Sequence, residues 1–339
     1  MGAAPLKVAV FDAKKYDIDS LDRANAGRFT LDYLTASLST RTVAAIGQAK
    51  AICIFVNDQC DAQVVEALAS VGVELIALRC AGFNNVDLAA CRRCGIDVVR
   101  VPEYSPYAVA EHTVALMLML NRHLHLAYQR NRVGYFLLDG LIGFDMKGKQ
   151  VGVVGTGRIG RATISILRGF GCRILAYDKN RSPEIAEDAE VRYVELDELL
   201  SSSDIITLHV PLFPETRYLI DERAIEQMKP GVMLINTSRG GLVDTKALIA
   251  GLKSGRIGFA GLDVYEEEAG IFFHDLSDQV LSDDVLARLM TFNNVVITSH
   301  QAFLTREALD NIADTTLANL AEFAADKRGA SLSNVVLPS

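Results

Sequence analysis

The sequence predicts an α/β protein built from two doubly wound parallel-sheet lobes, and three observations support this prediction. The chain has 339 residues, which corresponds to about two domains. Short apolar runs alternate with amphipathic stretches almost from end to end, a pattern typical of buried parallel strands covered by helices. A turn-rich stretch from Pro102 to Pro106 separates two series of such runs.

The first lobe is expected before this stretch. Four apolar runs are predicted to be its strands: 6–11, 51–56, 74–79 and 97–101. Helical patterns lie between them, as at 61–70 and 86–94. A last amphipathic helix, from Phe303 to about Lys327, is too small to form a domain, so we expect it to pack on the first lobe.

The second lobe begins with one long predicted helix from about Tyr107 to Arg130. Six strands are then expected: 150–154, 173–177, 204–208, 232–236, 258–262 and 294–298. We therefore expect one domain formed by 1–102 with 300–339, and a second domain, 103–299, inserted into it.

Composition and charge exclude several classes of protein. The chain is 50% hydrophobic and 22% charged, which argues against extensive disorder. Its net charge of −8 argues against a protein built to bind nucleic acid. The apolar stretch Val109–Leu120 is short and contains Glu111, and the N-terminus lacks the features of a signal peptide. We expect a soluble cytoplasmic protein with no membrane partner.

The cysteines and histidines predict no metal site. Six cysteines are spread over the chain, and we expect reduced thiols. Cys91 and Cys94 have the spacing of half a zinc site, but no second cysteine pair or spaced histidine pair completes it. We therefore interpret them as ordinary thiols of a helix.

The strongest local motif is a glycine-rich turn between a predicted strand and a predicted helix. Gly155 permits the tight turn, Gly157 lets the backbone approach a pyrophosphate, and Gly160 lets helix and strand pack closely. The N-terminus of the helix offers N–H groups and a positive dipole end to phosphates. This context predicts a dinucleotide site.

The next predicted strand ends at Asp178, 21 residues after Gly157. A carboxylate at this point would accept hydrogen bonds from the adenosine ribose and repel a 2′-phosphate, which favours NAD over NADP. Arg181 lies nearby and leaves some use of NADP open.

Polar residues follow the later strands at the edge where the carboxyl ends of a parallel sheet meet. The segments are His209–Pro211, Thr237–Gly241, Asp263–Glu268 and Ser299–Ala302. They bring together a cofactor loop, an arginine, carboxylates and a histidine, which could bind an anionic carbonyl substrate and move a proton.

Chemistry suggests the roles of these side chains. Arg239 can present a bidentate fork to a carboxylate or a carbonyl oxygen. His300 is a proton donor that a neighbouring carboxylate would keep charged, but spacing alone leaves the choice among Glu266, Glu267 and Glu268 open. His112, on an apolar helix, is expected to be structural.

Five motifs together carry a family resemblance. They are Gly155-x-Gly157-x-x-Gly160, His209-Val-Pro-Leu, Asn236-Thr-Ser-Arg239-Gly-Gly, Gly261-Leu-Asp-Val-Tyr-Glu and Thr298-Ser-His300-Gln-Ala. With Leu78-Arg-Cys-Ala-Gly-Phe-Asn-Asn, the chain resembles the D-isomer-specific 2-hydroxyacid dehydrogenases over nearly its whole length. Cys80-Ala-Gly-Phe-Asn and His300-Gln-Ala-Phe-Leu-Thr are similar to the fermentative D-lactate dehydrogenase branch. The resemblance implies a Rossmann NAD-binding domain inserted into a flavodoxin-like substrate domain.

The resemblance also implies roles for particular residues. The catalytic positions are Arg239, His300 and, among the three glutamates, Glu268. The substrate-binding positions are Ala81 and Gly82, whose backbone N–H groups would hold the substrate carboxylate, with Tyr104, Arg239 and His300. The cofactor-binding positions are Gly155, Gly157, Arg158, Ile159, Gly160, Asp178, Val210, Pro211, Thr216, Thr237, Ser238 and Asp263.

The implied activity is the reversible NADH-dependent reduction of pyruvate to D-lactate, with histidine as the general acid and base. Two alternatives remain: a reductase for a bulkier 2-keto acid such as phenylpyruvate or 2-ketoisocaproate, or an NAD-gated binding module of the corepressor type. The family's helix after the first lobe forms a dimer contact, so we expect a homo-oligomer, either a dimer or a tetramer.

Overall fold

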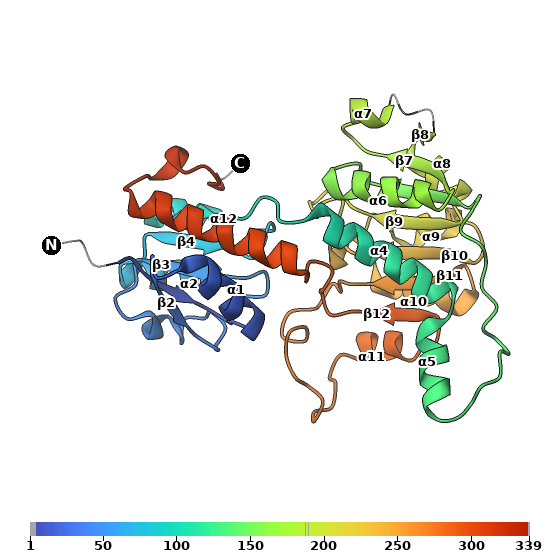
Figure 1. The fold of residues 1–339 in the computed structure, drawn as a ribbon, viewed down its shortest axis with the longest axis horizontal. Helices are drawn as coiled ribbons and strands as arrows, with labels where there is room; N and C mark the ends of the chain where they lie inside the picture. The colour runs from blue at the N-terminus through green and yellow to red at the C-terminus, as the bar shows by residue number, and fades with distance from the viewer. Residues whose placement is uncertain (1–4, 187, 189, 338–339) are drawn as a thin grey trace. The chain divides into compact units, whose positions relative to one another are not determined.

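The computed structural model describes residues 5–186, 188 and 190–337. The chain divides into two compact units, one formed by Met1–Ser105 with Leu304–Ser339 and the other by Pro106–Phe303 (Figure 1). The second unit is thus inserted between two segments of the first. The two boundaries lie a few residues later than the sequence pattern suggested.

The first unit contains a fully parallel five-stranded sheet in the order β2-β1-β3-β4-β5. Its strands are β1 (Lys7–Val10), β2 (Thr30–Tyr33), β3 (Ala51–Ile54), β4 (Leu75–Leu78) and β5 (Asp97–Val99). This is the flavodoxin-like order. The strand prediction omitted β2, an edge strand whose residues are partly or fully exposed and therefore form no apolar run.

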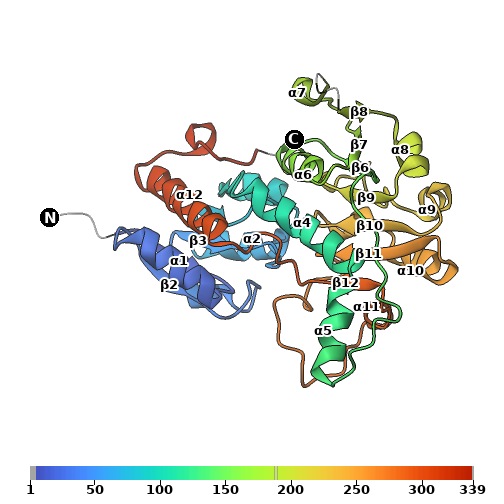
Figure 2. The same cartoon turned by 45° about the vertical axis from the view of Figure 1, so that its right-hand side comes forward.

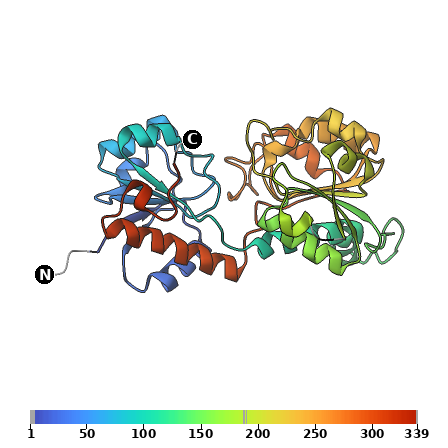
Figure 3. The same ribbon diagram turned by 90° about the horizontal axis from the view of Figure 1, so that it is seen from above.

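Helices cover both faces of this sheet (Figure 3). They are α1 (Lys15–Asn25), α2 (Ala62–Ser70), α3 (Leu88–Cys94) and α12 (Arg306–Ala324), with short 3₁₀ turns at Val43–Ile46 and Gly329–Ser331. The last helix packs beside α1 (Figure 1). It buries Leu317, Leu320 and Phe323 in the core of the first unit. The expected return of the chain to the first lobe is confirmed.

The second unit contains a parallel seven-stranded sheet in the order β12-β11-β10-β9-β6-β7-β8 (Figure 2). Its strands are β6 (Gln150–Val154), β7 (Arg173–Tyr177), β8 (Val191–Tyr193), β9 (Ile205–Leu208), β10 (Val232–Asn236), β11 (Ile257–Leu262) and β12 (Val295–Ile297). The prediction of six strands was wrong, because β8 is a short edge strand in which only Val191 is buried. The order is that of a Rossmann sheet with one added strand, so the predicted fold is confirmed.

The helices of this unit pack on both faces of the sheet (Figure 3). They are α4 (Pro106–Asn121), α5 (Leu124–Arg132), α6 (Arg158–Gly169), α7 (Pro183–Ala186), α8 (Leu196–Ser202), α9 (Glu222–Gln227), α10 (Thr245–Ser254) and α11 (Asp284–Met290), with a 3₁₀ turn at Gly240–Leu242. The single helix predicted from Tyr107 to Arg130 is in fact two. His123 adopts a left-handed conformation with φ of 51°, which ends α4 and turns the chain into α5.

Among the helices that the structure describes, none is both long and apolar enough to cross a membrane. No disulfide joins any of the six cysteines, all of which lie in the described residues. In the same described part of the chain, no group of three or more histidine, cysteine and acidic side chains could hold a metal ion.

Candidate active site

The glycine-rich turn joins β6 to α6 in a form that suits a dinucleotide. Gly155 has φ of 99°, and a Cβ there would lie 2.7 Å from the carbonyl carbon of His209. A Cβ on Gly160 would lie 2.0 Å from the oxygen of Gly155, so helix and turn approach as closely as the fingerprint requires. By contrast, a Cβ on Gly157 would meet nothing within 4 Å. The N-cap residue of α6 is Gly157, which has no side chain to cap the first N–H groups of the helix, so the turn fits a bound pyrophosphate.

Asp178 lies directly after β7 and is fixed beside this turn. Its Oδ2 accepts hydrogen bonds from Thr156 N (2.6 Å) and Thr156 Oγ1 (3.1 Å). The Tyr193 hydroxyl lies 2.7 Å from Thr156 Oγ1. Arg181 pairs with Glu195 at 3.1 Å and packs over the Tyr193 ring, 5.5 Å from its centroid. The carboxylate is therefore held beside the glycine turn, while the nearby arginine is paired with another acid.

The loops after β9 and β10 are joined by hydrogen bonds. Ser238 Oγ donates to Val210 O at 2.7 Å. Thr216 Oγ1 donates to Pro211 O at 2.7 Å, which closes the loop after β9. Thr237 Oγ1 lies 2.8 Å from the Thr113 hydroxyl of α4. These predicted cofactor positions therefore meet along one edge of the sheet.

His209, at the same edge, is a neutral imidazole. Burial lowers the pKa of His209 to about 3, and its Nε2 lies 3.0 Å from Thr207 Oγ1. A histidine with this pKa stays uncharged at neutral pH and is a poor general acid.

His300 forms a couple with one of the three candidate glutamates. Its Nδ1 lies 2.8 Å from Glu268 Oε1, while Glu268 Oε2 accepts a hydrogen bond from Tyr265 N at 3.1 Å. Glu266 instead accepts a hydrogen bond from Tyr218, at 2.9 Å, and Glu267 is exposed. Because a carboxylate only accepts, Nδ1 of His300 carries a hydrogen and Nε2 is the nitrogen left to exchange a proton.

Asp263 is a fully buried carboxylate that shapes the turn around His300. Its Oδ1 accepts from Gln301 N (2.8 Å) and Thr298 Oγ1 (2.6 Å), and its Oδ2 accepts from Ala302 N (2.9 Å). Burial by itself raises the pKa of Asp263, but hydrogen bonds from His112, Thr298 and Ala302 and the charge of His300 together hold it below its usual value.

Arg239 lies in the loop after β10. Its Nη1 donates to Ser238 O at 2.6 Å, and Asn236 Nδ2 donates to Arg239 O at 2.8 Å. A Cβ on the adjacent Gly240 would lie 2.0 Å from the carbonyl carbon of Tyr265, so only glycine permits this packing. Among the described residues no acidic group forms an ion pair with Arg239, which leaves its charge for a ligand.

The remaining predicted substrate positions belong to the first unit. Ala81 and Gly82 follow β4, and Tyr104 precedes α4 in the chain, with its carbonyl oxygen accepting from Asn311 Nδ2 at 2.6 Å. Across the residues that the structure describes, the N–H groups of Ala81 and Gly82 have no hydrogen-bond partner.

The chain was compared with known protein families and with individual known proteins. Residues 114–302 match the family described as "D-isomer specific 2-hydroxyacid dehydrogenase, NAD binding domain". The chain is 51% identical to D-lactate dehydrogenase of Escherichia coli over 316 residues, which cover 93% of this chain and 96% of the relative. The chain belongs to the D-isomer specific 2-hydroxyacid dehydrogenase family. The predicted family, enzyme class and NAD cofactor are confirmed.

Solved structures of this dehydrogenase family agree. The pyruvate reductase of Chlamydomonas reinhardtii has a TM-score of 0.91 at 46% identity, covering 98% of this chain and 99% of the other. The D-lactate dehydrogenase of Aquifex aeolicus, solved with NAD and lactic acid, has a TM-score of 0.86 at 32% identity, covering 98% and 99%.

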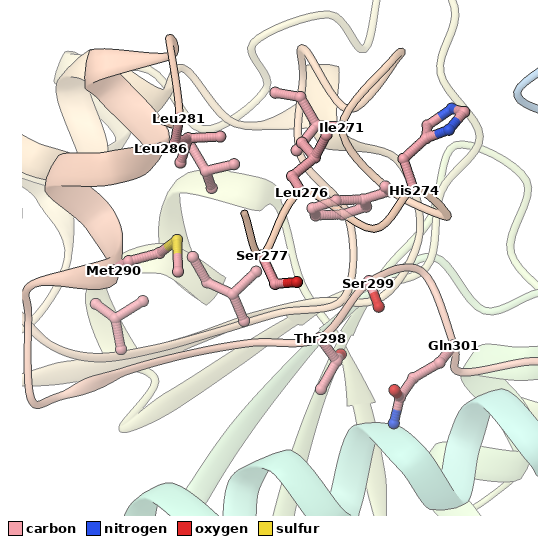
Figure 4. A pocket seen from close by; sticks show the side chains of 13 residues that line it. Ile271, His274, Leu276, Ser277, Leu281, Leu286, Met290, Thr298, Ser299 and Gln301 are labelled. Carbon is pink, nitrogen blue, oxygen red and sulfur yellow. The ribbon is translucent and has the colours of Figure 1, made fainter. Parts of the chain in front are cut away.

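The structure of this dehydrogenase also shows a cavity of about 620 Å³ beside β12 (Figure 4). Ser299 and Gln301, the two neighbours of His300 in the sequence, contribute to its wall. The lining residues are Ile271, Phe272, His274, Leu276, Ser277, Leu281, Leu286, Met290, Val295, Ile297, Thr298, Ser299 and Gln301. No sequence pattern predicted this cavity, because a loop, a helix and a strand jointly form its wall.

Two contacts in the dehydrogenase site lay beyond the sequence prediction. His112 was expected to be structural, yet its Nε2 lies 3.1 Å from Thr298 Oγ1 and 3.4 Å from Asp263 Oδ1. The Thr298 hydroxyl donates its only hydrogen to Asp263, so it accepts from Nε2–H of His112. Only the folding of α4 against the sheet brings these residues together.

Proposed function

We propose that this chain is a D-lactate dehydrogenase, which reduces pyruvate to D-lactate with NADH. The observation that carries the proposal is the 2.8 Å couple between His300 and Glu268, at the same sheet edge as Arg239 in an NAD-binding unit. The similarity to proteins described as D-lactate dehydrogenase and pyruvate reductase supports pyruvate as the substrate.

In this proposal, bound NADH supplies the hydride that adds to C2 of pyruvate. Arg239 binds the carbonyl oxygen and the carboxylate through its guanidinium, and the N–H groups of Ala81 and Gly82 bind the carboxylate. His300 donates the Nε2 proton to the oxygen as negative charge develops there, and Glu268 stabilises the charged imidazole before transfer. In the reverse direction, His300 accepts that proton. Tyr104 contacts the substrate from the first unit.

The cofactor would be held by residues at the carboxyl edge of the Rossmann sheet. Gly157 and the N-terminus of α6 would bind the pyrophosphate, and Asp178 would bind the adenosine ribose. The other proposed contacts are Gly155, Arg158, Ile159, Gly160, Val210, Pro211, Thr216, Thr237, Ser238 and Asp263.

The proposal is tested by following NADH absorbance with purified protein and a panel of pyruvate, phenylpyruvate and 2-ketoisocaproate. We expect the highest kcat/KM with pyruvate, and only the D isomer of lactate as product. If kcat/KM is higher with phenylpyruvate or 2-ketoisocaproate than with pyruvate, the bulkier keto acid is the substrate. Absence of turnover with every keto acid would instead support an NAD-gated binding module. The similarity to proteins described as D-lactate dehydrogenase argues against that alternative.

We also propose a homo-oligomer, a dimer or a tetramer, located in the cytoplasm. The segment from α5 to Ile142 exposes large apolar side chains, among them Val133, Phe136, Leu138 and Ile142, which are 82%, 72%, 77% and 89% exposed. A contiguous group of this kind supports a protein–protein contact. Light scattering at micromolar concentration tests the proposal, and a monomer mass would refute it.

Fractionation of the cells that make the protein tests its location.

A further inference from the structure

The loop after β4 is held from one side by the residues that follow β5. Val101 N donates a hydrogen bond to Cys80 O at 3.1 Å. The adjacent carbonyl, that of Ala81, accepts a hydrogen bond from Arg100 Nη1 at 2.8 Å. The carbonyl oxygens of two consecutive peptide groups are thus held by hydrogen bonds from Arg100 and Val101.

The geometry of the peptide bond then fixes the direction of two donors. In a planar trans peptide the N–H points opposite to the C=O of the same unit. The N–H of Ala81 therefore faces away from Val101, and the N–H of Gly82 faces away from Arg100. Neither N–H has a partner within the described part of the chain. Successive unpaired N–H groups of this kind form a concave anion site.

Arg100 is itself fixed and lacks a competing anion. Its guanidinium lies over the Phe83 ring, 5.2 Å from the centroid. Its backbone is bound by the C-terminal segment: Arg100 N donates to Asn334 O at 3.1 Å, and Asn319 Nδ2 donates to Arg100 O at 3.0 Å. No acidic group among the described residues lies within ion-pair distance of the guanidinium. Its positive charge therefore acts mainly on the Ala81–Gly82 peptide.

We infer that Arg100 is a positioning residue for the substrate carboxylate. It holds and polarises the Ala81–Gly82 peptide, so that the N–H of Gly82 is a stronger and correctly directed donor to an anion. Arg100 acts through the backbone and does not touch the substrate. The inference rests on the proposed function, in which the N–H groups of Ala81 and Gly82 bind the carboxylate of a 2-keto acid.

The variants Arg100→Met and Arg100→Lys test this role. In Arg100→Met we expect the KM for pyruvate, and the inhibition constant of its analogue oxamate, to rise about tenfold or more, as for loss of a hydrogen bond to a charged group. The kcat at saturating pyruvate should change less than about threefold, since a uniform binding contact is lost. The Kd for NADH should not change. Arg100→Lys keeps the charge and should recover part of the lost affinity.

The matched control is Arg92→Met, which removes an exposed arginine of α3 in the same unit. It should leave every constant at the wild-type value. Unchanged KM and oxamate affinity in Arg100→Met would overturn the inference, as would a parallel loss of kcat and NADH binding. If Arg100→Met does not fold, Phe83→Leu removes only the ring under the guanidinium. It should raise the KM for pyruvate by less than about tenfold, and an unchanged KM would again overturn the inference. Failure of the proposed function is a separate result, because the wild-type protein would then reduce no keto acid.

Discussion

His300 has φ of 54°, an unusual backbone conformation for a residue other than glycine. The turn is held by His300 N, which donates to Asp263 O at 2.7 Å, and by the Asp263 carboxylate, which binds the next two N–H groups. The backbone strain is thus maintained by a single buried aspartate. This fixes the imidazole beside Glu268 before any ligand binds.

At this residue we expect His300→Ala to reduce kcat by about 10²- to 10⁴-fold, the range typical of a general acid. The Kd for NADH, measured by fluorescence, should change little. His274→Ala is the control, because His274 is an exposed histidine of the same unit and should keep wild-type turnover. Survival of turnover in His300→Ala would assign the proton to another group.

Asp263 should link stability to pH. Its pKa lies below the usual value of 3.8, so its contribution to stability is complete above pH 3.8 and is lost as the pH falls through the lower pKa of the folded state. We expect Asp263→Asn to lower Tm at neutral pH, because an amide donor would then face backbone donors. The Tm difference from the wild type should narrow below about pH 4. A Tm difference that stays constant with pH would contradict an ionised Asp263 carboxylate in the folded protein.

Cofactor choice is also decided at single side chains. Asp178→Ser removes the carboxylate that would repel a 2′-phosphate, and Glu195→Gln releases Arg181 from its 3.1 Å ion pair. We expect the double variant to raise the ratio of kcat/KM for NADPH over NADH by at least about tenfold. An unchanged ratio would mean that other groups select the cofactor.

At the scale of elements, a buried ion pair joins α1 to Arg79, the residue that follows β4. Arg79 is 1% exposed, and its Nε lies 3.3 Å from Asp17 Oδ1. Asp17→Asn would leave a buried guanidinium without its counter-charge, so we expect a loss of about 3–5 kcal/mol in the free energy of unfolding of the first unit. Denaturant titration measures it. Asp19→Asn is the control on the same helix, where the exposed pair with Lys15 should contribute at most about 0.5 kcal/mol.

The elements that the sequence predicted well are those buried on both faces. Strands such as β3, β6 and β10 consist almost entirely of buried apolar residues, and a run of this kind needs no tertiary information to be recognised. The edge strands β2 and β8 were missed because only one side of each is paired and little of either is buried. The break between α4 and α5 was missed because residues on both sides of His123 continue a helical pattern.

At the scale of the molecule, the exposed apolar segment after α5 should determine assembly. Replacing Phe136 and Leu138 together by serine removes apolar surface without touching the core. We expect this variant to shift the oligomer toward the monomer in sedimentation at low micromolar concentration. Val280→Ser, at a position 95% exposed in the same unit, is the control and should not change the mass. An unchanged assembly in the serine variant would place the contact elsewhere.

The site could be predicted from the sequence only as far as the sheet edge. Motif positions after consecutive strands identified Arg239, His300 and the glycine turn, because parallel strands place their carboxyl ends together. Spacing alone left the choice among the three glutamates open; the family resemblance selected Glu268, and the structure places Glu268 rather than Glu266 beside His300. His112 meets Asp263 because a helix packs on the sheet, and Arg100 is held by residues of the C-terminal segment. The spacing of residues along the sequence gives no information about either contact.

The closing of the first unit by α12 has a consequence for biosynthesis. Leu317, Leu320 and Phe323 complete the core of that unit, and Asn319 and Asn334 bind Arg100. On the ribosome, residues 106–303 emerge before residues 304–339 and hold every strand of their own sheet. The first unit, although made earliest, must wait with an uncovered apolar face until the last helix is translated. The nascent chain would thus complete its nucleotide-binding half before the half that began it.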